Sequence, residues 1–172
     1  FEQSELMKPK ANLEKAGIET EVVSLEEGSI RGWDDKDWGE SVAVDKTVDN
    51  VANCEGYDAL LLPGGQINPD ILRMNERAVA IVREFAMADK PIAAICHAPW
   101  LLIEADLVKG KTLTSYHSIR TDMKNAGGFV APAGEGVFTE WYDDETASKV
   151  QQRYHADFRA FNFSKDWRRM WE

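Results

Sequence analysis

The feature that most constrains the fold of this chain is an apolar run over residues 57–62, which is closed by Pro63-Gly64-Gly65. A run of this kind indicates a strand that is buried on both faces, as the strands of a parallel sheet are. A helical stripe of apolar residues follows over residues 70–88, and a second short buried run covers residues 91–95. Two parallel strands need a crossover connection between them, so this order predicts a strand–helix–strand unit.

Strands and helices alternate through the rest of the chain as well. Apolar periodicity predicts helices over residues 4–16, 98–107, 118–125 and within 149–169, strands over residues 18–25, 112–116 and 137–141, and a β-rich excursion over residues 26–50. With 172 residues and no internal linker or repeat, the chain is expected to form one domain over residues 1–172. The predicted class is α/β, with a flavodoxin-like, doubly wound and mostly parallel sheet that carries helices on both faces.

Charge and cysteine content exclude several classes of protein. The formal net charge of -10 and the pI near 4.8 oppose binding to nucleic acid or to an anionic membrane. No apolar run reaches the roughly 18 residues that a membrane span needs, and no signal segment opens the chain, so we expect a cytoplasmic protein. The two cysteines, Cys54 and Cys96, stand outside any zinc-binding spacing, so neither a disulfide framework nor a bound metal is expected.

Cys96 is the strongest candidate for a catalytic residue. In a doubly wound fold the working residues lie beyond the carboxyl ends of the strands, and Cys96 directly follows the second buried run and precedes a helix that opens near Pro99. A helix N-terminus favours the thiolate, which is the nucleophilic form, so this turn is interpreted as a nucleophile elbow that carries cysteine. The plainer alternative is a buried and inert cysteine, which is our expectation for Cys54.

Two neighbouring features strengthen the catalytic interpretation. His97 is a candidate base on the next residue, although adjacent residues at such a turn point in different directions, and His97 need not touch the sulfur unless a carboxylate orients its ring. The turn Pro63-Gly64-Gly65 ends the other buried strand, and its N–H groups can approach a reacting oxygen without interference from a Cβ. Together, the two loops predict one site.

Four motifs, in this order along the chain, resemble those of the PfpI-like branch of the DJ/PfpI superfamily, which is related in fold to class I glutamine amidotransferases. They are Leu62-Pro63-Gly64-Gly65, Ile95-Cys96-His97-Ala98-Pro99, Thr114-Ser115-Tyr116 and Asp122-Met123-Lys124-Asn125-Ala126-Gly127. The similarity extends from Phe1 to about Gly128, and residues 129–172 are expected to diverge from the family. The family's central first strand ends just before its Phe-Glu pair and has no counterpart here, so we expect further residues upstream of Phe1.

The resemblance implies a role for each matching residue of the site. Cys96 would be the nucleophile, and Glu5 would hydrogen-bond its sulfur, with Glu2 as a second acidic position in the same motif. The amides of Gly65 and His97 would form the oxyanion pocket. On this basis Glu5 is a better proton partner for Cys96 than His97 is.

Two further residues match the family outside this set. Asp70 matches an acidic residue that reaches the histidine of a neighbouring subunit in oligomeric relatives, and Tyr116 matches a pocket residue. Plainer roles remain open: Asp70 as a charge favoured near a helix N-terminus, Tyr116 as a packing residue at a strand end, and Glu5 as a solvated helix residue. The resemblance also implies a homo-oligomer, a dimer or higher.

The resemblance implies an enzyme that needs no cofactor and attacks a carbonyl carbon. One substrate class is a reactive dicarbonyl such as methylglyoxal, or its adducts, which gives glyoxalase III or deglycase activity; we favour it because it needs only a small pocket. The second class is the peptide bond, which gives an intracellular cysteine peptidase. A third alternative is a stress-response chaperone or redox sensor in which Cys96 is oxidised.

Overall fold

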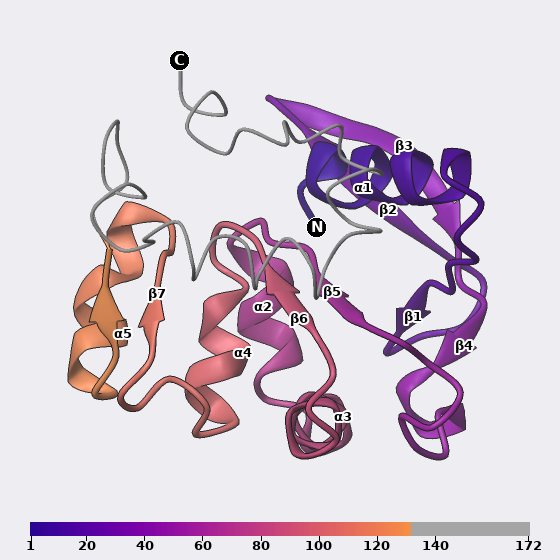
Figure 1. Cartoon of the computed structure of the whole chain (residues 1–172). Coiled ribbons are helices and arrows are strands. Elements are labelled where there is room, and N and C mark those ends of the chain that lie inside the picture. The colour runs from indigo at the N-terminus through magenta and orange to yellow at the C-terminus, as the bar shows by residue number, and fades with distance from the viewer. Residues whose placement is uncertain (132–172) are drawn as a thin grey trace. The chain divides into compact units, whose positions relative to one another are not determined.

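The computed structural model describes residues 1–131 of the chain (Figure 1). Two compact units share these residues: Phe1–Met7 with Glu21–Val130 form the first, and the second includes Lys8–Thr20. The first unit contains every described strand and every candidate site residue. The single domain stays a prediction, and the strand and the helix that we predict beyond residue 131 lie outside the described residues.

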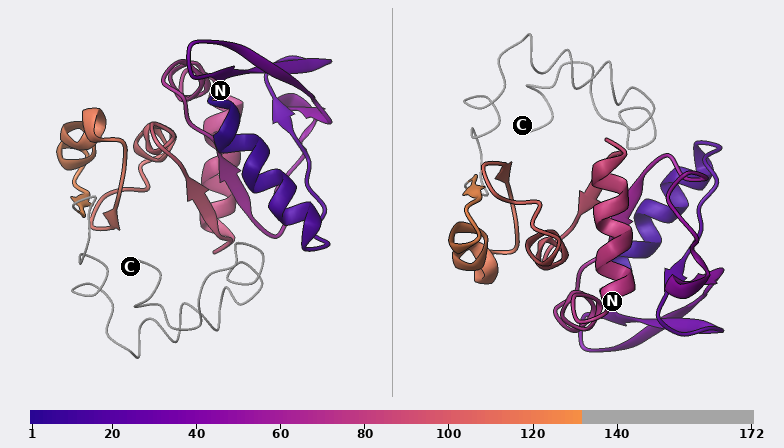
Figure 2. Two further views of the ribbon diagram at one scale, coloured as in Figure 1. Left: turned by 90° about the horizontal axis from the view of Figure 1, so that it is seen from above. Right: turned by 90° about the horizontal axis from the view of Figure 1, so that it is seen from below.

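Helices and strands alternate along the described chain (Figures 1 and 2). In chain order they are α1 (Gln3–Lys15), β1 (Val23–Ser24), β2 (Ser29–Asp34), β3 (Asp37–Ala43), β4 (Lys46–Thr47), the 3-10 turn η1 (Val48–Asn50), β5 (Leu60–Leu62), α2 (Ile67–Leu72), α3 (Glu76–Met87), β6 (Ile92–Ala94), α4 (Pro99–Glu104), β7 (Thr112–Leu113), the 3-10 turn η2 (His117–Ile119), α5 (Arg120–Asn125) and β8 (Phe129–Val130). This order agrees with the predicted flavodoxin-like α/β class.

The described strands pair in four sets of two. β1 with β4, β5 with β6, and β7 with β8 are parallel, whereas β2 and β3 form an antiparallel hairpin, which is the predicted β-rich excursion. The backbone of Phe1 and Glu2 links two of these sets: the Phe1 carbonyl accepts a hydrogen bond from the Trp33 amide of β2, and the Glu2 amide donates to the Gly64 carbonyl just beyond β5. The acidic N-terminal segment therefore lies at the carboxyl end of β5.

Several elements differ in extent from the sequence pattern: α4 and β7 end earlier than predicted, and at three other places a side-chain hydrogen bond accompanies the difference. β5 begins later than predicted, because the Lys90 ammonium group donates to the carbonyl of Tyr57. β1 is shorter than predicted, because the Asp45 carboxylate accepts a hydrogen bond of 2.7 Å from the Val22 amide in place of a strand partner. The helix predicted after β5 is two helices, α2 and α3, because the Asn75 side chain caps the start of α3.

Helix α3 connects the two apolar clusters of the first unit. Val79 and Val82 pack in the cluster that includes residues of β5, α4 and α5, and Phe85 packs in the cluster that includes Val48 of η1. β5 and β6 run in register from the pair Leu60 and Ile92 to the pair Leu62 and Ala94. Because these two parallel strands end at the same level, the loops that follow them meet.

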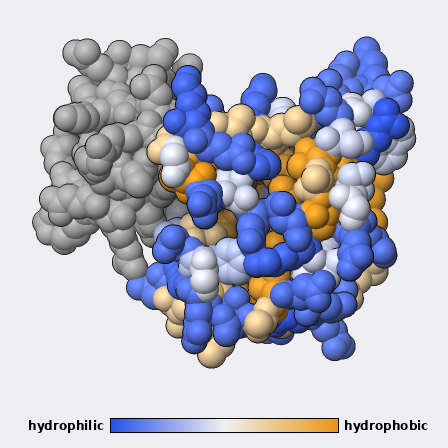
Figure 3. Space-filling view, turned by 90° about the vertical axis from the view of Figure 1, so that its right-hand side faces the viewer, coloured by the Kyte–Doolittle hydropathy of each residue, from blue (hydrophilic) through white to orange (hydrophobic). Residues whose placement is uncertain are grey.

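Hydrophilic residues cover most of the face shown in Figure 3, as expected for a chain in which 29% of the residues are charged. Isolated apolar side chains are exposed as well, Ile67 and Met87 among them. Within residues 1–131, no helix combines the length and the apolar character that crossing a bilayer requires.

Candidate active site

Cys96 lies on a tight turn between β6 and α4. Its φ angle is +61°, a left-handed conformation that a residue with a Cβ rarely adopts. Hydrogen bonds hold this turn, from the Ala98 amide to the Ile95 carbonyl (2.9 Å) and from the Tyr116 amide to the Cys96 carbonyl (2.8 Å). Helix α4 then begins at Pro99. The geometry is that of the predicted nucleophile elbow, in which a strained turn presents one side chain beyond the end of a strand.

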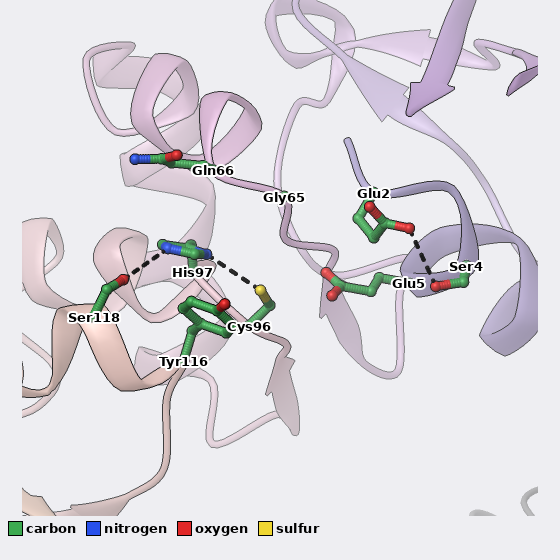
Figure 4. A pocket seen from close by; sticks show the side chains of 9 residues that line it. All are labelled: Glu2, Ser4, Glu5, Gly65, Gln66, Cys96, His97, Tyr116 and Ser118. Carbon is green, nitrogen blue, oxygen red and sulfur yellow. Dashed lines mark hydrogen bonds between the residues drawn. The ribbon is translucent and has the colours of Figure 1, made fainter. Parts of the chain in front are cut away.

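A pocket of about 600 Å³ opens over Cys96 (Figure 4). Its lining comes from the N-terminal segment, from the loops after β5 and β6, and from the segment after β7. The lining residues are Glu2, Ser4, Glu5, Gly65, Gln66, Cys96, His97, Tyr116 and Ser118. Every site residue predicted from the sequence is in this set except Asp70. Among the described residues, no three His, Cys, Asp or Glu side chains are grouped as metal ligands would be.

Glu5 is held beside Cys96 by the glycine turn after β5. Its Oε2 accepts a hydrogen bond of 2.9 Å from the Gly64 amide, and the charge of its carboxylate acts on the Cys96 thiol. Figure 4 shows the carboxylate pointing toward the sulfur. A Cβ on Gly64 would lie 2.5 Å from the Glu5 Oε2 and 2.7 Å from the Cys96 Cβ, so glycine is required for this approach. The structure therefore brings together the two residues that the resemblance paired.

Burial is the largest influence on the Cys96 thiol, and it raises the pKa of this group above the ordinary value for cysteine. The negative charge of Glu5 and its hydrogen bond raise the pKa further, whereas hydrogen bonds from the amides of Gly65 and His97 lower it. Two amides aimed at one point stabilise negative charge there. At neutral pH the resting group is therefore the thiol.

His97 contacts Cys96 directly, whereas we expected that it need not touch the sulfur. Its Nδ1 lies 3.2 Å from the Cys96 Sγ, and its Nε2 lies 3.0 Å from the Ser118 Oγ. The left-handed turn at Cys96 brings the two adjacent side chains to the same side, and a hydroxyl group, not a carboxylate, holds the far side of the ring. Burial lowers the pKa of His97 and the charge of His117 lowers it too, while Glu5 raises it, so the imidazole is neutral at pH 7.

Tyr116 forms one wall of the pocket. Its ring stacks on that of His97, with centroids 4.6 Å apart and planes inclined at 29°, and 43% of the residue is exposed. The Tyr116 ring also lies beside the ring of His117, with centroids 4.2 Å apart.

The sequence analysis did not identify Ser118 as a pocket residue, because this serine stands where a helix was predicted to begin. The signal that pointed to it is its position two residues after Tyr116, in the segment that follows β7.

The remaining two acidic candidates lie in different places. Glu2 lines the pocket, with its Oε1 3.5 Å from the Ser4 Oγ. Asp70 lies on α2, apart from the described lining, and its Oδ1 accepts a hydrogen bond of 2.7 Å from the Arg73 guanidinium group. The contact of Asp70 with a neighbouring subunit, and the homo-oligomer itself, stay predictions.

Comparison with known proteins gives matches over most of the chain. The model of the DJ-1/PfpI family matches residues 1–140. Deglycase PH1704 of Pyrococcus horikoshii is 41% identical over 164 residues, which cover 94% of this chain and 89% of that protein. The protein/nucleic acid deglycase 2 of Escherichia coli is 40% identical over 166 residues, with 94% and 88% covered. The putative cysteine protease YraA of Bacillus subtilis is 41% identical over 128 residues, with 74% and 72% covered.

A solved structure supports the architecture independently of sequence. The crystal structure of Drosophila melanogaster DJ-1beta matches with a TM-score of 0.71 and 23% identity, over 94% of this chain and 88% of that one. The predicted fold class is thereby confirmed.

Proposed function

The chain belongs to the DJ-1/PfpI family and is an enzyme of that family; on this premise we propose that it is a deglycase that acts on reactive dicarbonyls and their adducts, with Cys96 as its nucleophile. The observation that carries the proposal is the placement of the Cys96 thiol between the Glu5 carboxylate and the amides of Gly65 and His97. This set provides a nucleophile, a proton acceptor and donors for an oxyanion. The names of the relatives above support the substrate class.

The proposed reaction balances without an external oxidant or a cofactor. With an amine adduct of methylglyoxal, the Cys96 sulfur bonds to the carbon that derives from the aldehyde, and the amine leaves with a proton. The hydrogen on that carbon moves to the neighbouring ketone carbon, so that the first carbon is oxidised to a thioester and the second is reduced to an alcohol. Water then cleaves the thioester, which releases lactate and restores the thiol. Free methylglyoxal follows the same route after direct addition of the thiol.

Each group around the sulfur has a part in this sequence of steps. Glu5 accepts the thiol proton as the sulfur attacks and returns it to the leaving amine, and the two backbone amides hold the oxygen of the hemithioacetal. The pocket of about 600 Å³ has room for a three-carbon dicarbonyl and the group attached to it. Among the described residues, its lining includes Glu2 and Glu5 but no Lys or Arg, so it favours neutral or cationic adducts over anionic ones.

Peptide cleavage is a second candidate, because one relative is named as a putative cysteine protease. The same thiol and amides would serve that reaction, but a peptide binds along an extended surface, and the described site is a compact pocket. A chaperone or redox-sensor role is the third candidate, since the Cys96 thiol is only half-buried and open to oxidation. A cytoplasmic location is part of the proposal.

The proposal is tested by incubating the protein with methylglyoxal adducts of N-acetyllysine and following the release of lactate and of the free amine. We expect lactate to form, and we expect prior alkylation of Cys96 by iodoacetamide to abolish it. Casein under the same conditions should stay intact. Peptide fragments without lactate would favour the peptidase, and a peroxide-dependent mass gain at Cys96 without either product would favour the redox sensor.

Replacing Glu5 by glutamine is expected to make the Cys96 thiol easier to ionise and yet to slow lactate formation. The amide oxygen of glutamine still accepts the Gly64 N–H, but the negative charge is lost, so the pKa of the Cys96 thiol falls toward its ordinary value. Lactate formation nevertheless slows by about 10²- to 10⁴-fold, because no carboxylate takes the thiol proton. The pH dependence of Cys96 alkylation measures the first effect. A rise of the alkylation pKa of Cys96 in Glu5→Gln would contradict this expectation.

A further inference from the structure

The hairpin of β2 and β3 carries two exposed tryptophans that pair across its strands (Figure 1). Trp33 and Trp38 are partners in register, and their ring centroids lie 5.5 Å apart with the planes at 84°. Trp33 is 40% exposed and Trp38 is 55% exposed, and within the described chain neither belongs to the two apolar clusters of the first unit. The two perpendicular rings therefore form an aromatic corner that faces solvent.

Hydrogen bonds hold the aromatic corner in place before any partner binds. The Trp33 Nε1 donates to the Asp35 carbonyl at 3.0 Å, and the Asp37 Oδ1 accepts a hydrogen bond of 2.7 Å from the Trp38 amide. A surface that is already ordered loses little conformational freedom on binding, so a contact with it gains affinity at a low entropic cost.

The charges around the aromatic corner favour a cationic partner. All six residues of 33–38 are exposed, and the hairpin over residues 29–43 has acidic side chains at Asp34, Asp35, Asp37 and Glu40 and basic ones at Arg31 and Lys36. Arg31 is used within the hairpin, where it donates to the carbonyls of Gly39 (3.0 Å) and Trp38 (3.4 Å). The face of a tryptophan ring attracts a cation, and the neighbouring acidic side chains attract the same charge and repel phosphate groups.

The cations of the described chain leave the aromatic corner to a partner. Among residues 1–131, the cations over aromatic rings are Lys46, whose Nζ lies 5.4 Å from the Tyr57 centroid, and Arg73, whose Cζ lies 4.5 Å from the Trp100 centroid. Neither of these rings belongs to the aromatic corner. A lysine or arginine side chain from another molecule fits it by charge and by chemistry.

The hairpin is joined to the segment that lines the pocket. The Trp33 amide donates to the Phe1 carbonyl at 2.8 Å, and Trp33 also forms a parallel bridge with Glu2, which is a lining residue. On the other strand, the Glu40 amide donates to the Gln3 side chain. A polypeptide whose modified residue enters the pocket therefore has its neighbouring residues beside the hairpin.

We propose that the aromatic corner binds lysine and arginine side chains of the polypeptide that carries the adduct, so that the substrate is a basic segment of a protein and not a nucleic acid. The proposal rests on the proposed function for the adduct itself. The binding of cations rests on the hairpin alone.

The test measures the binding of unmodified, fluorescently labelled peptides by anisotropy. One peptide is rich in lysine and arginine, and in the other these residues are replaced by glutamate. We expect the wild-type protein to bind the basic peptide roughly tenfold more tightly, and the difference to shrink as the salt concentration rises. Equal affinities, or tighter binding of a single-stranded DNA oligonucleotide, would overturn the proposal. A protein that binds the basic peptide but forms no lactate keeps this proposal and loses the proposed function.

Substitutions in the hairpin separate the attraction of a ring for a cation from simple apolar contact. Trp38→Ala and Trp38→Leu both remove the aromatic face, so each should weaken binding of the basic peptide roughly twofold to fivefold, whereas Trp38→Phe keeps a ring and should keep most of the affinity. Asp35→Asn removes one formal charge and keeps a residue type that tolerates the φ of +55° at this position. It should weaken binding at low salt and leave it unchanged at high salt.

Two matched controls lie away from the hairpin. Met87→Ala removes an apolar side chain that is 87% exposed at the end of α3, and Asp58→Asn removes one acidic side chain from the exposed segment before β5. Both should keep the wild-type affinity, and equal affinities for Trp38→Ala and Met87→Ala would overturn the proposal. A lower molar mass in solution for Trp38→Ala would mean that a second copy of the chain covers the aromatic corner, and it would overturn the proposal as well.

Discussion

Replacing Cys96 with serine is expected to lower kcat/KM for lactate formation by roughly 10³-fold or more, because the loss of a nucleophile removes most of the catalysis in an enzyme whose groups act as a unit. A hydroxyl group ionises far less readily than a thiol does. At this position burial and the charge of Glu5 already raise the pKa of the thiol, so a serine would attack only as the neutral alcohol. Serine is close to cysteine in size, so the turn should persist, and the melting temperature checks that it does.

The matched control for this substitution is Cys54→Ser. Cys54 is the other cysteine of the chain and is buried, with 8% exposed. Its Sγ lies 3.6 Å from the Glu84 carbonyl, inside the apolar cluster that includes Phe85, and it lies apart from the described pocket lining. We expect Cys54→Ser to keep the wild-type kcat/KM. If Cys96→Ser keeps more than about a tenth of it, the sulfur is not the nucleophile and the proposed reaction is wrong.

The meeting of the loops after β5 and β6 could be predicted from the sequence, because it depends on the order of strands alone. The first buried run is followed by the turn Pro63-Gly64-Gly65 and the second by Cys96 and His97. Parallel strands that are joined by a helix end at the same edge of their sheet, so these two loops meet. The register between Leu62 and Ala94 places Gly64 and Cys96 two residues beyond the ends of β5 and β6. No such rule brings Glu5 to this edge, since its helix precedes the strands. Its place beside Cys96 was expected only through the family resemblance.

The contacts of His97 could not be predicted, because they depend on a backbone angle. An ordinary φ would direct the side chains of Cys96 and His97 apart, and the sequence does not reveal the value of +61° at Cys96. Ser118 was missed for a related reason. Helical periodicity describes residues that face a core, whereas the role of Ser118 follows from a single hydroxyl at the edge of a pocket.

The lengths of the elements were predicted less well than their order, because polar side chains end them. Lys90 donates to carbonyls before β5, and Asn75 starts a new helix within one apolar stripe. Both residues are far less conspicuous in a hydropathy pattern than the glycines and prolines that close the runs. The apolar pattern therefore predicts which elements exist and in what order. Residues whose side chains cap a helix or hydrogen-bond the backbone set where the elements begin and end.

Replacing Gly64 with alanine is expected to lower kcat/KM by about 100-fold, because a displacement of catalytic groups by about 1 Å has an effect of this size. The new Cβ would lie 2.5 Å from the Glu5 Oε2, 2.6 Å from the Ile95 carbonyl oxygen and 2.7 Å from the Cys96 Cβ. The Glu5 carboxylate can swing away, but the other two contacts belong to the turn that carries Cys96. The methyl group therefore separates the proton acceptor from the thiol and shifts the strained turn, which also costs about 1–3 kcal/mol of stability.

The matched control is Gly56→Ala, since Gly56 has an ordinary φ and a Cβ there would meet nothing within 4 Å. Gly56→Ala should keep both the wild-type kcat/KM and the wild-type melting temperature. A loss that is confined to Gly64→Ala then reports the crowding at the site and not the general effect of replacing a loop glycine.

The alkylation rate of Cys96 distinguishes two ways in which Gly64→Ala can act. If Glu5 alone moves, the loss of its charge lowers the pKa of the Cys96 thiol, and alkylation at pH 7 becomes faster, as in Glu5→Gln. If the turn is displaced, the thiol also loses the amide donors of Gly65 and His97, and alkylation becomes slower. Wild-type kcat/KM in Gly64→Ala would show that the approach of Glu5 to Cys96 does not matter for turnover.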